Sequence, residues 1–320
     1  MSDTTHLLVP YVALSSPPAQ EALAGLALPH LDRLLARLTP LASDLGDEDD
    51  RSAPHERALA RALGLPSADG RIPWAAWQVQ QMDSPPPAAP GAAWAFVSPC
   101  QWQVRTDHVT LEDPQALGLD ETASRALLGI LAPWFAQDGI TLHYDQPTRW
   151  LAQGDVFAGL ATASLERVLH RDVRAWLPAS EQAAGLRRLH SEMQMLLYTH
   201  AFNDAREAQR QPPVNAFWIY GAGALLHQAP APTGPAPQVD ATLQGAALRQ
   251  DWGAWQSAWQ ALDAGPIAQL ERHVAGGGAA QLTLCGERSA LSWHTAPRSL
   301  WQKINRVFKP QRFAGVREQL

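Results

Sequence analysis

Hydrophobic residues in the first forty positions form one short continuous run, followed by a stripe with helical spacing. The run from Leu7 to Val12 is typical of a buried strand, and Pro17 and Pro18 interrupt the pattern after it. The stripe predicts a helix, which Pro29 divides or restarts because proline inside a helix removes a hydrogen bond. The residues of this stripe are Leu23, Leu26, Leu31, Leu34, Leu35 and Leu38.

The same two patterns recur along the rest of the chain. They predict strands at 93–97, 140–145 and 282–285, and helices near 120–139 and 186–197. Asp120 at the start of the first of these helices and Gly139 just past its end are typical helix-terminating residues. Trp252, Trp255 and Trp259 share one face of a further helix, where core or partner-helix contact is expected rather than stacking on a ligand.

Strands that alternate with helices favour an α/β fold with helices on both faces of a sheet. The proline-rich stretch at residues 229–238 predicts a long loop or a boundary. We therefore expect one α/β domain over residues 1–297, with a sub-boundary at 229–238, and a basic C-terminal tail over residues 298–320.

Length and composition favour a globular protein of the cytoplasm. A chain of 320 residues that is 46% hydrophobic can bury a full core. No apolar run of about 18 residues is present, and the N-terminus lacks the basic and apolar regions of a signal peptide. Cys100 and Cys285 lie far apart with no metal-binding spacing, so we expect two buried free thiols.

Charge separates the body of the chain from its tail. A net charge of −6 argues against nucleic acid as a partner, since binding the phosphate backbone requires a basic surface. The tail alternates basic and apolar residues, which is typical of a basic amphipathic helix that contacts an acidic partner or a membrane surface. A terminal helix docked on the protein itself is the alternative. The basic residues are Arg298, Lys303, Arg306, Lys309, Arg312 and Arg317.

A cluster of carboxylates between Asp44 and Asp50 is a weaker signal. It contains Gly46 but lacks the ligand spacing and the distal glutamate of a calcium-binding loop. We expect a solvated loop there.

The segments 199–206 and 212–223 combine residue types that bind small anions. A guanidinium forms a fork that suits carboxylate or phosphate, amide side chains orient hydroxyl groups, and glycines let backbone N–H groups approach an anion at the end of a parallel strand. For Asn203 and Arg206 the alternative is a structural cap with a buried salt bridge. The candidate ligand-binding residues are Asn203, Arg206, Asn215, Gly221 and Gly223.

These residues resemble the motif of the archaeal-type cofactor-independent phosphoglycerate mutases of the alkaline phosphatase superfamily, which carry Asn-x-x-Arg, Pro-x-Asn and Trp-x-x-Gly-x-Gly in this order. Residues 28–34 and 105–110 resemble two further segments of that family. The whole chain is also similar to bacterial RpfE-type regulatory proteins. The resemblance implies an alkaline phosphatase-like fold with a mostly parallel central sheet, and the isomerase chemistry of the family.

The chain departs from the family at the positions that hold two divalent metals. Where the resemblance implies an aspartate followed by glycine, the first strand ends in Val9, Pro10 and Tyr11, and where it implies an Asp-His pair, Cys285 is followed by Gly286, Glu287 and Arg288. The implied aspartate with a histidine four residues later corresponds to Asp263 with Ile267. We therefore expect no metal or other cofactor, and a non-catalytic protein that binds a small phosphorylated or carboxylate ligand or has a regulatory role.

Two alternatives remain open from the sequence. One is an active metal-dependent mutase or phosphatase with ligands at other positions, such as Asp107, His108 or Asp263. For the Asp107–His108 pair we predict a strand, with the two side chains on opposite faces. The other alternative is an interaction module that uses the basic tail.

Overall fold

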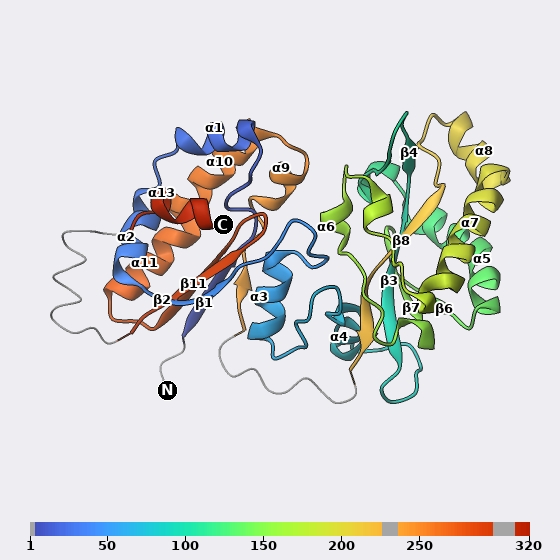
Figure 1. Ribbon diagram of the computed structural model, residues 1–320, viewed down its shortest axis with the longest axis horizontal. Helices are drawn as coiled ribbons and strands as arrows, with labels where there is room; N and C mark the ends of the chain where they lie inside the picture. The colour runs from blue at the N-terminus through green and yellow to red at the C-terminus, as the bar shows by residue number, and fades with distance from the viewer. Residues whose placement is uncertain (1–3, 226–235, 297–310) are drawn as a thin grey trace. The chain divides into compact units, whose positions relative to one another are not determined.

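The computed structural model describes residues 4–225, 236–296 and 311–320 (Figure 1). The chain divides into two compact units: unit 1 consists of Met1–Gly64 with Ala231–Leu320, and unit 2 consists of Leu65–Pro230. Unit 2 is thus inserted as one continuous segment into the sequence of unit 1. Most of the expected sub-boundary at 229–238 and most of the basic tail lie outside the described residues.

Unit 1 is built on a five-stranded sheet in the order β2-β11-β10-β1-β9. The strand β1 is parallel to β10 and to β9, whereas β10 is antiparallel to β11 and β11 is antiparallel to β2, so the sheet is mixed. Its strands are β1 (Thr5–Val9), β2 (Thr39–Asp44), β9 (Gln238–Val239), β10 (Ala280–Cys285) and β11 (Ala290–His294).

Helices cover both faces of this sheet. Leu7 and Val9 contact the cluster formed by α1, α2, α10 and α11, which lie beside one another in Figure 1, whereas Leu8 faces α3 with Cys285. Alternate residues of β1 are therefore buried on opposite sides, which explains why the sequence reads as a continuous apolar run. The helices are α1 (Pro17–Ala24), α2 (Pro29–Arg37), α3 (Pro54–Ala62), α9 (Gln244–Leu248), α10 (Trp252–Leu262), α11 (Ala268–Ala275) and α13 (Phe313–Val316).

Two expectations for unit 1 are confirmed. Pro29 is the first residue of α2, where a missing backbone N–H costs nothing. On α10, Trp255 and Trp259 are fully buried and meet at a 75° angle between their rings, so the tryptophan stripe belongs to the core.

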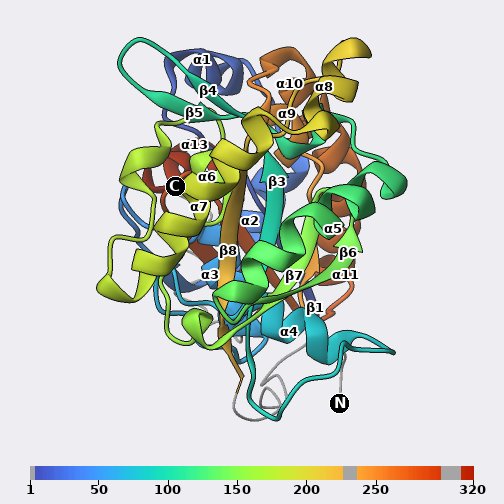
Figure 2. The ribbon, with the colours of Figure 1, turned by 90° about the vertical axis from the view of Figure 1, so that its right-hand side faces the viewer.

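Unit 2 contains a four-stranded antiparallel sheet in the order β6-β7-β3-β8 and a separate hairpin, β4-β5. Helices α5 and α7 cover one face of the sheet, and α4 packs on the other against Trp94 and Phe96 (Figure 2). The strands are β3 (Ala93–Cys100), β4 (Trp102–Val104), β5 (Val109–Leu111), β6 (Thr141–Gln146), β7 (Arg149–Gln153) and β8 (Ala216–Ala224). The helices are α4 (Trp74–Gln81), α5 (Glu121–Gln137), α6 (Leu165–Val168), α7 (Ala184–Tyr198) and α8 (Ala201–Ala208).

The mixed α/β class is confirmed, with helices on both faces of the two larger sheets, but the expected mostly parallel sheet is wrong. Among the described strands, only the pairings of β1 are parallel. Short connections account for part of the difference: β10 and β11 are joined by residues 286–289, and β6 and β7 by residues 147–148, which is enough chain for a hairpin but not for a parallel crossover.

Two further sequence predictions concern the cysteines and the absence of a long apolar segment. Cys100 and Cys285 are buried free thiols, as expected. In the part of the chain that the structure describes, no helix is long and apolar enough to cross a membrane.

Candidate functional site

Asn203, the first of the sequence-predicted ligand residues, is buried in α8 and binds the protein's own backbone. Its side-chain nitrogen donates hydrogen bonds to the carbonyl oxygens of Leu197 and Val214 at 2.8 and 2.7 Å, and its oxygen accepts from the Val214 nitrogen at 2.9 Å. The amide therefore ties the end of α7 to the segment that enters β8.

Arg206, one turn further along α8, is also buried and also binds carbonyl groups. Its Nε donates to the oxygen of Pro212 at 2.8 Å, and a terminal nitrogen donates to the oxygen of Leu117. Burial lowers the pKa of this guanidinium, because a charged group loses hydration in the interior. No salt bridge to Arg206 occurs among the described residues, so its main partners are backbone dipoles.

Asn215 fastens the start of β8 to β4. Its oxygen accepts from the Trp102 nitrogen at 2.7 Å, and its nitrogen donates to the Trp102 oxygen at 2.9 Å. The side chain thus replaces one step of a strand ladder.

Gly221 and Gly223 lie inside β8, where they allow α4 to approach. Gly221 has a φ of 61°, and a Cβ atom there would lie 3.0 Å from the Cβ of Trp74. At Gly223 a Cβ atom would lie 2.8 Å from the Cβ of Pro73. The argument from the end of a parallel strand does not apply here, because β8 is an antiparallel edge strand.

The residues considered as alternative metal ligands lie in different units. Asp107 and His108 are exposed in the turn between β4 and β5, and their side chains form a 2.6 Å hydrogen bond, so the predicted strand with opposed side chains is wrong at this point. Asp263 is buried in the π-helical turn after α10, and its carboxylate accepts hydrogen bonds from the first turn of α2. Among the described residues, no group of three His, Cys, Asp or Glu side chains is placed to hold a metal ion.

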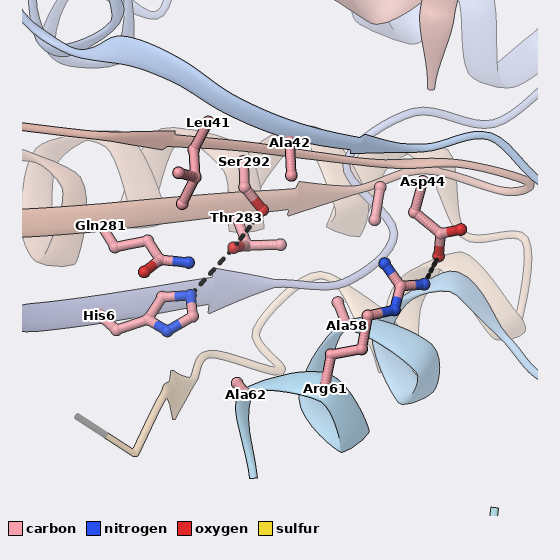
Figure 3. A pocket seen from close by; sticks show the side chains of 11 residues that line it. His6, Leu41, Ala42, Asp44, Ala58, Arg61, Ala62, Gln281, Thr283 and Ser292 are labelled. Carbon is pink, nitrogen blue, oxygen red and sulfur yellow. Dashed lines mark hydrogen bonds and ion pairs between the residues drawn. The ribbon is translucent and has the colours of Figure 1, made fainter. Parts of the chain in front are cut away.

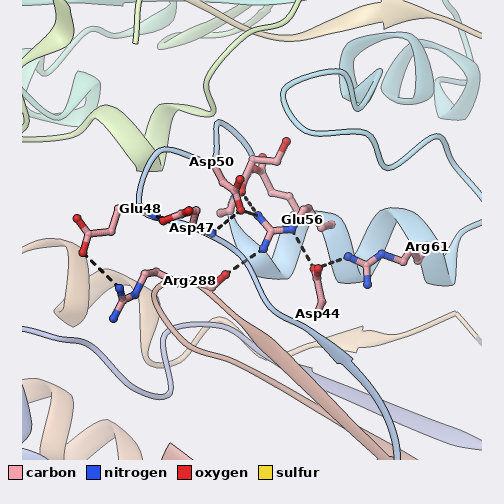
Figure 4. A network of polar contacts seen from close by, with 10 residues as sticks. Asp44, Asp47, Glu48, Asp50, Glu56, Arg61 and Arg288 are labelled. Atoms are coloured by element: carbon pink, nitrogen blue, oxygen red, sulfur yellow. Dashed lines mark hydrogen bonds and ion pairs between the residues drawn. The ribbon is translucent and has the colours of Figure 1, made fainter. Parts of the chain in front are cut away.

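The carboxylate cluster is a solvated loop only in part: Asp47, Glu48 and Asp49 are exposed, whereas Asp44 and Asp50 are half-buried. Arg57 of α3 is buried and donates to Asp44 at 2.9 Å and to Asp50 at 3.0 Å, as well as to the carbonyl oxygens of Ser52 and Arg288. Figure 4 shows this network at the end of β2. Asp44 and Asp50 therefore neutralise a buried cation and hold the 44–52 loop against α3.

A cavity of about 290 Å³ opens beside this network, on the face of the unit 1 sheet that α3 covers only in part (Figure 3). Its floor comes from neighbouring strands: His6 from β1, Gln281 and Thr283 from β10, and Ser292 from β11. Arg61 of α3 lies at its edge. With Asp44 of β2, which also lines it, the cavity combines six hydrogen-bonding side chains from five elements, which makes it the candidate site.

The floor of this cavity is a hydrogen-bonded row across three strands. His6 Nε2 lies 2.9 Å from Thr283 Oγ1, which lies 2.9 Å from Ser292 Oγ. The row follows from the register, because Thr283 pairs with Ser292 directly and with Leu8, two residues from His6 on the same face. Burial lowers the pKa of His6 to about 4, so the ring is uncharged at neutral pH.

Arg61 supplies the cation of this cavity. It forms an ion pair with Asp44, whose carboxylate also accepts from Arg57. The Arg61 side chain is 44% exposed, in contrast to 6% for Arg57. A guanidinium has five N–H donors, so Arg61 retains donors for a molecule that enters the cavity.

Sequence reasoning did not single out this cavity. The available signal was the presence of His6, Gln281 and Thr283 within otherwise apolar strands, at positions that alternate with buried leucines. Polar residues on one face of a buried strand indicate either solvent or a lined pocket, and strand order decides between them.

Comparisons with known proteins find only distant structural similarity. No family model matches it, and no curated protein matches it. Its structure is similar to that of a cofactor-independent phosphoglycerate mutase from Thermoplasma acidophilum, with 12% identity, a TM-score of 0.39, and coverage of 93% of this chain and 91% of that one. It is also similar to the PH0037 protein from Pyrococcus horikoshii, with 12% identity, a TM-score of 0.41, and coverage of 92% and 88% respectively.

Proposed function

We propose that the protein binds a small phosphorylated or carboxylate ligand in the cavity lined by His6, Thr283, Ser292 and Arg61, and that it acts as a binding or regulatory protein. The single observation that carries this proposal is the position of Arg61, a cation with unused donors at the edge of an uncharged hydrogen-bonding floor. An anionic group of the ligand pairs with Arg61, and hydroxyl groups of the ligand pair with the floor.

Replacement of Asp44 by the ligand as the partner of Arg61 costs little. Exposed ion pairs contribute about 0 to 1 kcal/mol, because water competes for both charges. Asp44 remains bound to the buried Arg57 when Arg61 turns away. The loop at residues 44–52 therefore keeps its anchor while the ligand binds.

The floor suits a ligand that carries hydroxyl groups. Hydroxyls of Thr283 and Ser292 both donate and accept, and the neutral His6 ring offers one donor and one acceptor. Charged side chains in the floor would select the charge of every ligand group that touches it. Because the floor is uncharged, Arg61 selects the charge of the ligand. A phosphorylated or carboxylated small hydroxy acid satisfies both parts of the cavity.

The contacts of Asn203 and Arg206 favour this cavity over the α8–β8 segment. Their side chains already bond to carbonyl groups of Leu197, Val214, Pro212 and Leu117. A ligand there must break buried hydrogen bonds, each of which costs about 1 to 3 kcal/mol when left unmade.

Isothermal titration calorimetry with 3-phosphoglycerate, glycerate and inorganic phosphate tests the proposal, with and without Mn²⁺. We expect saturable binding of at least one of these anions to the wild type, and about tenfold weaker binding to Arg61→Ala and to Thr283→Val, from the loss of one charged or one buried hydrogen bond. Arg125→Ala, which removes an exposed ion-paired arginine in α5, is the matched control and leaves binding unchanged.

Two outcomes contradict the proposal. One is the absence of saturable binding of all three anions to the folded wild type. The other is binding that persists in Arg61→Ala but is lost in Arg206→Gln, with folding of both variants verified by circular dichroism, because this result assigns the anion to the α8–β8 segment.

A further inference from the structure

A second cavity, of about 280 Å³, lies in unit 2 between α7 and β8. In contrast to the cavity of unit 1, its walls are mainly apolar and aromatic: Trp102, Phe217 and Trp218 line it together with Leu186 and His190. Its volume is close to the lower limit of small-molecule sites, roughly 300 Å³, which corresponds to a ligand of one or two rings.

His190 belongs to an uncharged aromatic wall. Its ring stacks on Trp102, with 4.2 Å between centroids and 28° between planes, and lies 4.9 Å from the ring of Phe217. Burial lowers the pKa of His190 to about 4, so this wall carries no charge at neutral pH. Walls made of ring faces and edges bind planar rings by offset and edge-to-face contact.

Arg187 is an exposed residue that lines the cavity and provides a charge. One of its terminal nitrogens donates to the carbonyl oxygens of Pro178 and Ser180, at 2.9 and 3.0 Å. Among the described residues no carboxylate lies within ion-pair distance of it, whereas the adjacent Arg188 is paired with Asp138 and Glu192. Arg187 is therefore a fixed cation whose charge is not balanced locally.

We propose that this cavity binds a small aromatic carboxylate, with the ring against the wall of Trp102, Phe217 and Trp218 and the carboxylate on Arg187. The apolar walls account for the ring, and the unbalanced guanidinium accounts for the acid. This ligand differs from the hydroxylated anion proposed for unit 1, and the two sites share no residue.

Ligand-observed NMR titrations with benzoate, benzamide and cyclohexanecarboxylate test this proposal on the full-length protein. We expect benzoate to bind most tightly, since benzamide lacks the charge and cyclohexanecarboxylate lacks the planar ring. Arg187→Gln, a change at an exposed residue, weakens benzoate about tenfold and leaves benzamide unchanged, because only the charged hydrogen bond is removed.

Two further variants separate the site from general effects. Ser191→Trp places a large ring at the exposed lining residue Ser191 and abolishes benzoate binding, whereas Arg188→Gln, the neighbouring arginine outside the cavity, retains it. The proposal is overturned if folded wild type does not bind benzoate at millimolar concentration, if cyclohexanecarboxylate binds as tightly as benzoate, or if Ser191→Trp binds benzoate as the wild type does.

Discussion

The carboxylate of Asp263 accepts a hydrogen bond from the backbone nitrogen of Leu31 at 2.8 Å, although 232 positions separate the two residues in the sequence. Its other oxygen accepts from the nitrogen of His30 at 3.2 Å. A buried aspartate from the π-helical turn after α10 thus caps the first turn of α2, where N–H groups have no partner within the helix. Asp263, which the sequence suggested as a possible metal ligand, therefore links the N-terminal and C-terminal segments of unit 1.

Removal of this cap destabilises unit 1. We expect Asp263→Ala to lower the free energy of unfolding by about 2 kcal/mol, and Asp263→Asn by less, because the amide keeps one acceptor oxygen. Urea denaturation followed by circular dichroism measures both. Glu21→Ala, which removes an exposed carboxylate on α1, is the control and stays within about 0.5 kcal/mol of wild type. Equal stability of Asp263→Ala and Glu21→Ala argues against the cap.

The same substitution has opposite effects at two glycines of unit 2. Gly221→Ala lowers the free energy of unfolding by about 1 to 3 kcal/mol, since φ is 61° and the new Cβ meets Trp74. Gly129→Ala, on the exposed side of α5 with open space around it, raises the free energy by about 0.5 to 1 kcal/mol. Thermal and urea denaturation of the two variants give the sign directly. A stabilising Gly221→Ala contradicts the close approach of α4 to β8.

Asn203 is predicted to stabilise the protein whether or not a ligand is present. Asn203→Ala removes three hydrogen bonds to backbone groups that remain buried, so we expect a loss of about 2 to 4 kcal/mol. Glu207→Ala, an exposed change on the same helix, serves as the control, with a change of at most about 0.5 kcal/mol. Urea denaturation without any added anion measures both, and a loss in Asn203→Ala that matches the control rules out the structural role.

The buried histidines make stability depend on pH. In the unfolded chain His6 and His190 take up protons near pH 6.5, whereas in the folded protein their pKa values are lowered to about 4. Since protonation favours the unfolded state between these values, the contribution of each neutral ring is complete above pH 6.5 and is lost as the pH falls towards 4.

The size of this effect is about 1.4 kcal/mol per unit of pKa shift, or about 3 kcal/mol for each histidine over that range. Urea denaturation at a series of pH values between 7.5 and 4 measures it. We expect His6→Gln and His190→Gln to show a shallower fall in the free energy of unfolding than wild type. His273→Gln, an exposed change on α11, keeps the slope of wild type, and identical slopes in all four proteins contradict the assignment to buried rings.

The sequence was sufficient for four helices with a clear apolar stripe and for several central strands, because their periodicity is local. The stripes of α2, α5, α7 and α10 and the apolar runs of β1, β3 and β10 all correspond to elements of the structure. In contrast, β2 was not predicted: it begins near Pro40, its side chains are mostly exposed, and it lies at a sheet edge, so its composition resembles that of a loop. Strand direction also leaves no periodic signal, which explains the error about parallel pairing.

A different ambiguity limited the prediction of the candidate ligand-binding residues. The sequence pattern of an asparagine and an arginine one turn apart is the same whether their side chains bind an anion or the carbonyl groups of their own chain. For Asn203 and Arg206 the partners lie up to 89 positions away, at Leu117, so only the folded structure identifies them. The unit 1 cavity is likewise visible only in the folded structure, because its floor forms where His6 contacts Thr283, 277 positions away in the sequence.

The order of strands around β1 has a consequence for synthesis. Both described neighbours of β1, the strands β9 and β10, belong to the part of the chain that follows unit 2. A ribosome therefore releases this apolar strand long before either neighbour exists, and all of unit 2 is made in the interval. During that time β1 has no native ladder to join, so its apolar side chains and its backbone are available to chaperones and to non-native pairing. Substitutions that make β1 more apolar are thus expected to reduce the yield of soluble protein even where the finished sheet tolerates them.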